Sequence, residues 1–217
     1  MQNDAVKFAD DLVSCMRSLA DLGLNTGRSG NASVRVDSQS YAITPSGVHP
    51  RKLTAAEIVE LAVAELEIPS HKNPSSEWRM HRDIFAAYDH VNAIVHTHSN
   101  AATALSCLRQ GIPSFHYMVA VAGGDSIECA PYATFGSIEL SKHTVAALEG
   151  RRACLLANHG LVTTGDTLLQ AQDLALEVEQ LAFQYLMCLK AGKPTILSKD
   201  EMNEVIEKFK TYGKRTG

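Results

Sequence analysis

The sequence predicts an α/β fold in which helices pack on a mixed sheet, within a single domain that spans residues 1–217. Helical and strand-like hydrophobic patterns alternate along the middle of the chain, and no linker, internal repeat or low-complexity segment interrupts them. The length of 217 residues is close to the usual domain size of roughly 100–200 residues. A chain of this size can bury about 70% of its unfolded surface. Folding therefore needs neither disulfides nor a structural metal, and any metal would serve chemistry.

The N-terminal part is predicted to be a helix followed by a hairpin. Apolar residues recur at helical spacing from Ala5 to Leu19, and Gly23 follows as a helix end. After a stretch rich in Gly, Ser and Asn, residues 33–36 and 41–44 alternate in polarity and are rich in β-branched side chains, as strands are. The polar residues 37–40 between them predict a turn.

Strands and helices are expected to alternate in the middle of the chain. Residues 58–64 predict a strand, and a helix is predicted after Ser75 and Ser76, with an apolar face that runs from Trp78 to Tyr88. The apolar run 93–95 predicts a strand that leads into His96, and an alanine-rich helix follows to about residue 109. A further strand is predicted around residues 126–130.

The C-terminal part is predicted to contain a helix over 137–148, a buried strand over 153–157, one long helix over 166–190 and a final helix over about 199–210. The long helix carries two apolar stripes, which is more apolar width than one core face needs. We expect the second stripe to contact another helix or another subunit.

Charge and cysteine content narrow the possible functions. The 20 Lys and Arg residues against 24 Asp and Glu residues give a formal net charge of −4, which argues against nucleic acid or an anionic membrane as partner and favours a small molecule. The five cysteines form no C-x-x-C pair, so neither a disulfide framework nor a cysteine-based zinc site is indicated. Because the N-terminus lacks a signal-peptide pattern and no apolar run approaches about 18 residues, we expect a cytoplasmic protein.

His96 and His98 stand at the end of an apolar strand and are candidate metal ligands. Residues two apart on a strand point to the same face, so both imidazoles can bind one ion. His159, in an Asn-His-Gly turn after another apolar strand, is the best candidate for a third ligand, because ligand sites collect at strand ends in open α/β folds. Three imidazoles with an open coordination position are typical of a catalytic zinc-type site. The alternative is that they are solvated or core histidines, as we predict for His81 on a buried helix face.

Glu77 is predicted to lie in the first turn of the helix that follows the two serines. Beside a metal, it can act as the base that removes a carbon-bound proton, because the metal stabilises the resulting enolate oxygen. The alternative is an acid that complements the helix dipole.

Three short polar segments are candidate parts of an anion cradle. They place Gly, Ser and Asn residues at turns or helix starts, where backbone N–H groups and hydroxyls can bind a phosphate. Each segment by itself is also compatible with an ordinary turn or cap. The segments are 30–33, 44–47 and 75–76.

Together these motifs resemble the class II aldolase family of the L-fuculose-phosphate aldolase type, along nearly the whole chain. The resemblance implies a three-layer α/β/α fold around a central mixed, largely antiparallel sheet. It also implies a cyclic homotetramer with active sites at subunit interfaces. The segments that carry it are 29–35, 43–47, 74–79, 93–98, 116–118, 123–124, 129–136, 158–161 and 207–213.

The same resemblance implies the metal and the acid/base groups. One Zn²⁺ per subunit would be held by His96, His98 and His159. Glu77 would be the acid/base, and it is a candidate fourth ligand when no substrate is bound. Tyr117 from the neighbouring subunit would protonate the aldehyde oxygen.

The remaining site residues implied by the resemblance surround the substrate. Tyr212 would help to close the site, and Phe135 would line the aldehyde end. Arg28 stands where a small hydroxyl residue is expected, and it could add a charged phosphate contact. The phosphate would otherwise be bound by Gly30, Asn31, Ser46, Gly47, Ser75 and Ser76.

The expected reaction is the reversible cleavage of a (deoxy)ketose 1-phosphate between C3 and C4, which gives dihydroxyacetone phosphate and a small aldehyde through a metal-stabilised enediolate. Candidate substrates are L-fuculose 1-phosphate, 5-deoxyribulose 1-phosphate and 5-methylthioribulose 1-phosphate. Alternatives on the same fold are a sugar-phosphate 4-epimerase, whose relatives carry aspartate where Glu77 stands, a methylthioribulose-phosphate dehydratase and a sugar-acid phosphate decarboxylase. A zinc hydrolase is disfavoured by the polar segments, and a scaffold module without metal is disfavoured by the complete His and Glu set.

Overall fold

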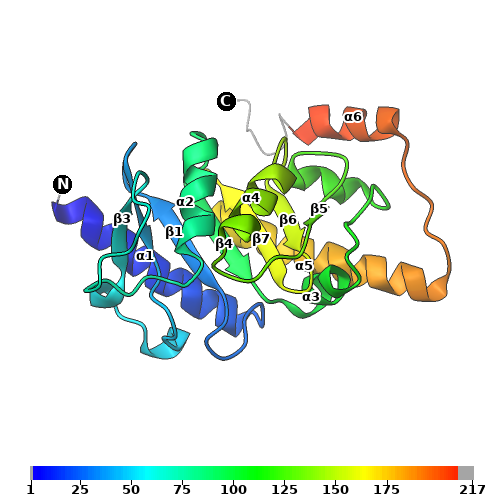
Figure 1. Cartoon of the computed structure of the whole chain (residues 1–217). Helices are drawn as coiled ribbons and strands as arrows, with labels where there is room; N and C mark the ends of the chain where they lie inside the picture. The colour runs from blue at the N-terminus through cyan, green and yellow to red at the C-terminus, as the bar shows by residue number, and fades with distance from the viewer. Residues whose placement is uncertain (1, 210–217) are drawn as a thin grey trace.

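Residues 2–209, the part of the chain that the computed structural model describes, are built around one seven-stranded sheet in the order β3-β2-β1-β4-β7-β6-β5 (Figure 1). Neighbouring strands are antiparallel except β5 and β6, which pair in parallel. The predicted mixed, largely antiparallel sheet is therefore confirmed. The strands are β1 (Asn31–Arg35), β2 (Ser40–Ile43), β3 (Val59–Ala62), β4 (Ala93–Thr97), β5 (Glu128–Ala130), β6 (Ala153–Leu156) and β7 (Gly160–Gly165).

Helices cover both faces of this sheet and make the three layers. The helices α2 and α4 pack against each other on one face, whereas α1, α3 and α5 lie on the other (Figure 1). The final helix α6 follows an extended segment and contacts the short helix η3. The α-helices are α1 (Gln2–Asp21), α2 (Trp78–Ala87), α3 (Asn100–Cys107), α4 (Ile138–Ala147), α5 (Leu168–Ala191) and α6 (Lys199–Phe209), and the 3₁₀ helices are η1 (Pro50–Lys52), η2 (Ala55–Glu57) and η3 (Tyr117–Ala122).

Alternation along the central strands explains why both faces are covered. In β4, Ile94 belongs to the apolar cluster beneath α2 and α4, while its neighbour Val95 belongs to the cluster beneath α1, α3 and α5. Cys154 and Leu155 divide between the two clusters in the same way in β6. Successive strand residues point to opposite faces, so a strand that is apolar throughout requires a helical layer on each side.

The strand β7 was not predicted from the sequence, although it is central and pairs with both β4 and β6. Its run Gly-Leu-Val-Thr-Thr-Gly contains two threonines, which make it less apolar than its neighbours. Thr163 is fully buried because its hydroxyl donates to the carbonyl of Ala171 over 2.7 Å. Hydrogen bonding to the helix that follows thus permits a polar residue in a buried strand, and this partner cannot be seen in a hydrophobic pattern.

The start of β1 and the end of β4 meet at one point of the sheet. Asn31, the first residue of β1, lies opposite His96 in the antiparallel β1–β4 pair.

Within the part of the chain that the structure describes, no helix has both the length and the apolar character needed to cross a membrane.

Candidate active site

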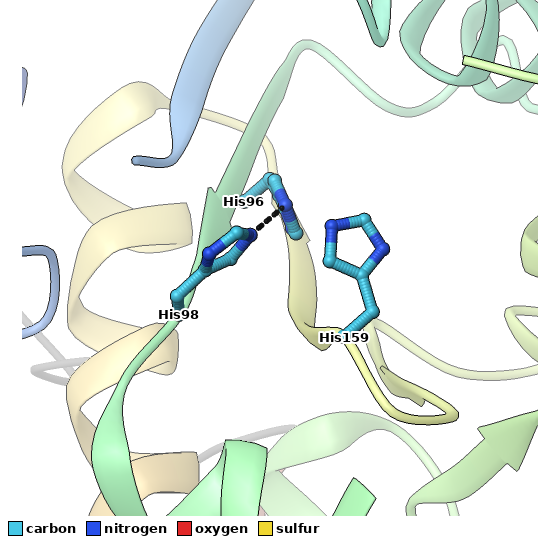
Figure 2. A group of neighbouring side chains, drawn as sticks. All are labelled: His96, His98 and His159. Atoms are coloured by element: carbon cyan, nitrogen blue, oxygen red, sulfur yellow. Dashed lines mark hydrogen bonds between the residues drawn. The ribbon is translucent and has the colours of Figure 1, made fainter. Parts of the chain in front are cut away.

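Three histidines converge at the end of β4 and in the turn after β6 (Figure 2). His96 is the fourth residue of β4, His98 follows the end of that strand, and His159 lies in the turn between β6 and β7. Their candidate ligand atoms lie within 4.8 Å of one another. The Nε2 atoms of His96 and His98 are 3.0 Å apart. The structure therefore brings together the three predicted metal ligands, and no other such group is found within residues 2–209.

The chemistry of these histidines fits a divalent metal of the zinc type. The Nδ1 atom of His96 lies 2.9 Å from the carbonyl oxygen of Leu161. A carbonyl only accepts hydrogen bonds, so Nδ1 carries a proton and Nε2 is the nitrogen that can bind a metal. A tetrahedral zinc ion with Zn–N bonds of about 2.0–2.1 Å separates its nitrogen ligands by roughly 3.3 Å, close to the distance observed between the first two histidines.

Glu77 lies directly beside the histidines. It is the N-cap residue of α2, one position before the helix and not inside its first turn as predicted, and its side chain makes no capping hydrogen bond. The Oε2 atom accepts from Nδ2 of Asn31 over 3.0 Å and lies 3.1 Å from Nε2 of His96. The Oε1 atom is buried without a hydrogen bond, and Nε2 of His159 lies 3.4 Å from it. The carboxylate therefore faces the cluster and does not cap the helix.

Burial and neighbouring charges shift the pKa values of these groups in different directions. Burial, reinforced by the neighbouring His96, lowers the pKa of His98 and His159 to about 4 each. Burial alone would raise the pKa of Glu77, but the charges of His96 and His159 and the hydrogen bond from Asn31 outweigh it and hold that pKa well below its usual range. Burial by itself would lower the pKa of His96, but the adjacent Glu77 carboxylate has the larger net effect and raises this pKa. At neutral pH Glu77 is ionised, while His98 and His159 are neutral.

Glu77, His98 and His159 line a cleft of about 320 Å³. A larger groove of about 720 Å³ lies near the end of α5, away from these residues. We place the candidate active site in the smaller cleft because titratable groups with strongly shifted pKa values converge there. The predicted site residues that line it are Arg28, Gly30, Asn31, Ser76, Glu77, His98, Phe135 and His159.

The predicted phosphate segments lie beside one another, and Gly30, Asn31 and Ser76 from two of them line the cleft. The segment at Thr44 lies beside that at Ser75, because the amide of Ser75 donates to the carbonyl of Thr44 over 2.9 Å. The Ser75 hydroxyl then accepts from the amide of Glu77 over 3.2 Å, so this serine stabilises the turn that leads into α2. Ser46 and Gly47 lie in the adjacent turn and do not line the cleft itself.

The residues expected at the aldehyde end are placed differently. Phe135 lines the cleft and is 65% exposed. Tyr117 begins η3, is 50% exposed, stacks on Phe209 and does not line the cleft of its own chain. Tyr212 lies outside the described residues.

Sequence reasoning missed Asn25, Tyr132 and Asn158. Tyr132 and Asn158 line the cleft, whereas Asn25 accepts a hydrogen bond from the amide of His98 over 3.0 Å. A Cβ atom on Gly30, whose φ is +76°, would lie 2.2 Å from Nδ2 of Asn25, so only glycine fits there. The polar character of residues 24–31 indicated a loop, but the contact with His98 depends on a strand 73 residues away.

Comparison with known proteins agrees with this fold and places the chain in a family. The family described as "Class II Aldolase and Adducin N-terminal domain" matches residues 10–186. A 5-methylthioribulose-1-phosphate/5-deoxyribulose-1-phosphate aldolase of Rhodospirillum rubrum is 50% identical over 98% of this chain and 96% of its own length. The L-fuculose phosphate aldolase of Escherichia coli K12 is 45% identical over 96% of this chain and 97% of its own. A solved L-fuculose 1-phosphate aldolase superposes with a TM-score of 0.89 at 38% identity, covering 94% of this chain and 96% of that one.

A buried carboxylate beside three histidines that lie at or next to strand ends is a site that can hold a catalytic metal ion. The chain belongs to the class II aldolase family, and it is an aldolase.

Proposed function

We propose that the protein is a Zn²⁺-dependent aldolase that reversibly cleaves a (deoxy)ketose 1-phosphate between C3 and C4 into dihydroxyacetone phosphate and a small aldehyde. The observation that carries the proposal is the Glu77 carboxylate, which is buried to 5% exposure and faces three convergent imidazoles in a cleft with glycine and hydroxyl residues at its rim. Such an arrangement suits the removal of a carbon-bound proton next to a metal-stabilised oxygen.

His96, His98 and His159 would hold one Zn²⁺ per subunit. The donor set supports this, since three neutral imidazoles leave an open coordination position for substrate. When bound, the ion would offset the negative charge that develops on the enediolate oxygens during cleavage, so no Schiff-base lysine is needed.

Glu77 would move the proton at C3. In the cleavage direction it donates a proton to C3 of the enediolate and yields dihydroxyacetone phosphate, and in the synthesis direction it removes that proton. Its Oε1 atom suits this role, because Oε2 is already engaged by Asn31 and His96 while Oε1 has no hydrogen bond. A free, buried carboxylate oxygen is a stronger base toward a bound substrate than one already satisfied by donors.

The phosphate would sit at the N-terminal end of α2. Backbone N–H groups at a helix start attract anions, and the exposed residue Arg28 also lines the cleft. Asn31 can serve both groups, because its amide nitrogen carries two hydrogens and only one is directed to Glu77. The full set proposed for the phosphate is Arg28, Gly30, Asn31, Ser46, Gly47, Ser75 and Ser76.

The aldehyde would lie against Phe135, with a neighbouring subunit completing the site. The large exposed fraction of Phe135 and of Tyr117 is consistent with burial in a homotetramer, where Tyr117 of one subunit would reach the cleft of the next and protonate the aldehyde oxygen. Tyr212 would help to close the same end.

The candidate substrates share their dihydroxyacetone phosphate half and differ in the aldehyde. The relative with 50% identity favours 5-methylthioribulose 1-phosphate and 5-deoxyribulose 1-phosphate, and the relative with 45% identity keeps L-fuculose 1-phosphate as a third candidate. An exposed phenylalanine at the aldehyde end suits methylthioacetaldehyde and acetaldehyde better than a hydroxylated product, because it offers no hydrogen bond.

The proposal can be tested without knowing the aldehyde, because dihydroxyacetone phosphate alone undergoes the proton-transfer step. Proton NMR of dihydroxyacetone phosphate in D₂O would follow exchange of the C3 hydrogens, with zinc-loaded enzyme and after a chelator. We expect stereospecific exchange of one C3 hydrogen that the chelator abolishes. Glu77→Gln should keep zinc but lose about 10²- to 10⁴-fold in exchange rate, the usual contribution of a general base. Glu67→Gln, a change at an exposed carboxylate, is the matched control.

Two results would contradict the proposal. Full exchange by Glu77→Gln would remove that residue from the proton transfer. No exchange by zinc-loaded wild-type protein would favour the 4-epimerase or the dehydratase on the same fold, neither of which is required to ionise C3 of dihydroxyacetone phosphate.

A further inference from the structure

Four buried polar side chains form one continuous line of hydrogen bonds that ends at Glu77. The Ser33 hydroxyl lies 2.6 Å from Nδ1 of His81, and Nε2 of His81 lies 2.6 Å from Oδ1 of Asn31. The amide nitrogen of Asn31 then donates to Oε2 of Glu77 over 3.0 Å. Ser33 and His81 are fully buried, and Asn31 and Glu77 are each 5% exposed.

Two elements supply this line through their own periodicities. Asn31 and Ser33 are two residues apart on β1 and therefore point to the same face of the sheet. Glu77 and His81 are four residues apart at the start of α2 and therefore lie one above the other on one side of the helix. The face of β1 that meets α2 is thus polar at two positions where a core would otherwise be apolar.

The hydrogen bonds in this line can run in one direction only. A carboxylate accepts and does not donate, so the nitrogen of the Asn31 amide faces Glu77 and its oxygen faces His81. The imidazole must therefore donate from Nε2 to reach that oxygen. Burial lowers the pKa of His81 to about 3, so the ring is neutral and Nδ1 accepts the proton of the Ser33 hydroxyl.

We propose that His81 is a positioning residue for the proton-transfer step, which acts by holding the Asn31 amide with its nitrogen toward Glu77. This inference rests on the function proposed for Glu77. With Oε2 held by Asn31, the other oxygen, Oε1, is the one left free to exchange a proton with substrate.

His81 can have this role because the nitrogen and the oxygen of an amide side chain can exchange positions with little change of shape. If His81 carried its proton on Nδ1, its bare Nε2 would face the Asn31 oxygen, and two acceptors at 2.6 Å would repel each other. The amide would then turn its nitrogen to His81 and its oxygen to the Glu77 carboxylate. That arrangement would set the amide oxygen against a carboxylate oxygen, two acceptors with no hydrogen between them. A neutral His81 that donates from Nε2 avoids it, and the Ser33 hydroxyl, which can donate or accept, then donates to Nδ1.

The decisive experiment compares two substitutions of nearly equal size. In His81→Gln the side-chain amide nitrogen can occupy the position of Nε2 and still donate to Asn31, whereas the shorter side chain in His81→Asn reaches only the position of Nδ1. We expect His81→Asn to lower the rate constant of C3 hydrogen exchange by about 10- to 100-fold, as is usual when a residue that orients a reacting group is lost. Zinc content should stay unchanged, and His81→Gln should recover most of the rate. His71→Asn, at an exposed histidine, is the control.

A second measurement does not depend on activity. ¹⁵N NMR of the histidine side chains, in metal-free and zinc-loaded protein, should show His81 neutral with its proton on Nε2 in both. Ser33→Ala, which removes the donor to Nδ1, should broaden or shift this signal and give an exchange rate between those of the wild type and His81→Asn. If His81→Asn fails to fold, the ¹⁵N spectrum and the Ser33→Ala variant test the inference instead.

Three results would overturn the inference: a proton on Nδ1 or a charged ring in the wild type, equal loss in His81→Gln and His81→Asn, or loss of zinc in His81→Asn. A wild-type enzyme without any exchange would instead refute the function proposed for Glu77, while the His81 spectrum would still test the hydrogen-bond direction.

Discussion

Gly160 begins β7 between two of the histidines, and we predict that replacing it by alanine disrupts the metal site. A Cβ atom at this position would lie 2.4 Å from the backbone carbonyl oxygen of Thr97, 3.0 Å from Cδ2 of His98 and 3.4 Å from Cε1 of His96. The first contact is with backbone, which cannot rotate away as a flexible side chain can. Strands β4 and β7 must therefore separate beside His96 and His98.

The size of the effect follows from these distances. An ordinary carbon-to-oxygen contact is about 3.3 Å or longer, so Gly160→Ala requires a backbone shift of roughly 0.9 Å. Overpacking of this kind costs typically about 1–3 kcal/mol of the free energy of unfolding. A shift of that size also moves His98 relative to His159. We expect zinc affinity to fall by about 10- to 100-fold, the range seen when ligand orientation is lost, which corresponds to about 1.4–2.7 kcal/mol.

Two assays measure the two effects separately. Urea denaturation of the metal-free protein gives the change in the free energy of unfolding, and competition with a chromophoric chelator gives the zinc affinity. Gly124→Ala is the control, because the nearest atom to its Cβ is Cγ of Arg151 at 3.5 Å, an ordinary contact. We expect that control to stay within about 0.5 kcal/mol of the wild type. Wild-type stability and zinc affinity in Gly160→Ala would refute the placement of β7 against the two histidines.

Two further predictions concern pH and the aldehyde end. Burial lowers the pKa of His81 from 6.5 to about 3. Between these two pH values the unfolded chain binds a proton at His81 that the folded chain does not bind. The free energy of unfolding should therefore be highest above pH 6.5 and fall by about 1.4 kcal/mol per pH unit as the pH falls toward 3. Urea denaturation of metal-free protein over this range should show a shallower pH dependence for His81→Gln than for the wild type, and equal slopes would contradict the burial argument. Phe135→Ala should lower kcat/KM for aldehyde addition by roughly tenfold, the effect of removing apolar contact from a substrate, and should leave C3 exchange of dihydroxyacetone phosphate unchanged. Loss of that exchange would place Phe135 nearer the enediolate than proposed.

Local sequence patterns predicted most elements and part of the site. The spacing of His96 and His98 on an apolar strand was enough to pair them on one face, because strand geometry depends only on neighbouring residues. The same holds for the amphipathic helix from Trp78 and for the alternating strands β1 and β2. Glu77 was placed one residue too far into its helix, since helix boundaries depend on capping contacts that a hydrophobic pattern does not contain.

The sequence by itself determined which residues carry the chemistry: the paired histidines, the carboxylate after two serines, and the polar turns. Only the tertiary structure decided how they are used. His81 was predicted as a buried, hydrogen-bonded histidine, but its partners Asn31 and Ser33 come from a strand about 50 residues away, and the antiparallel pairing of β1 with β4 sets Asn31 opposite His96. The central strand β7 and the contact of Asn25 with His98 are of the same kind. Hydrophobic periodicity reports how a segment is buried, whereas the partner of a buried polar group is set by strand register and helix packing between segments far apart in the chain.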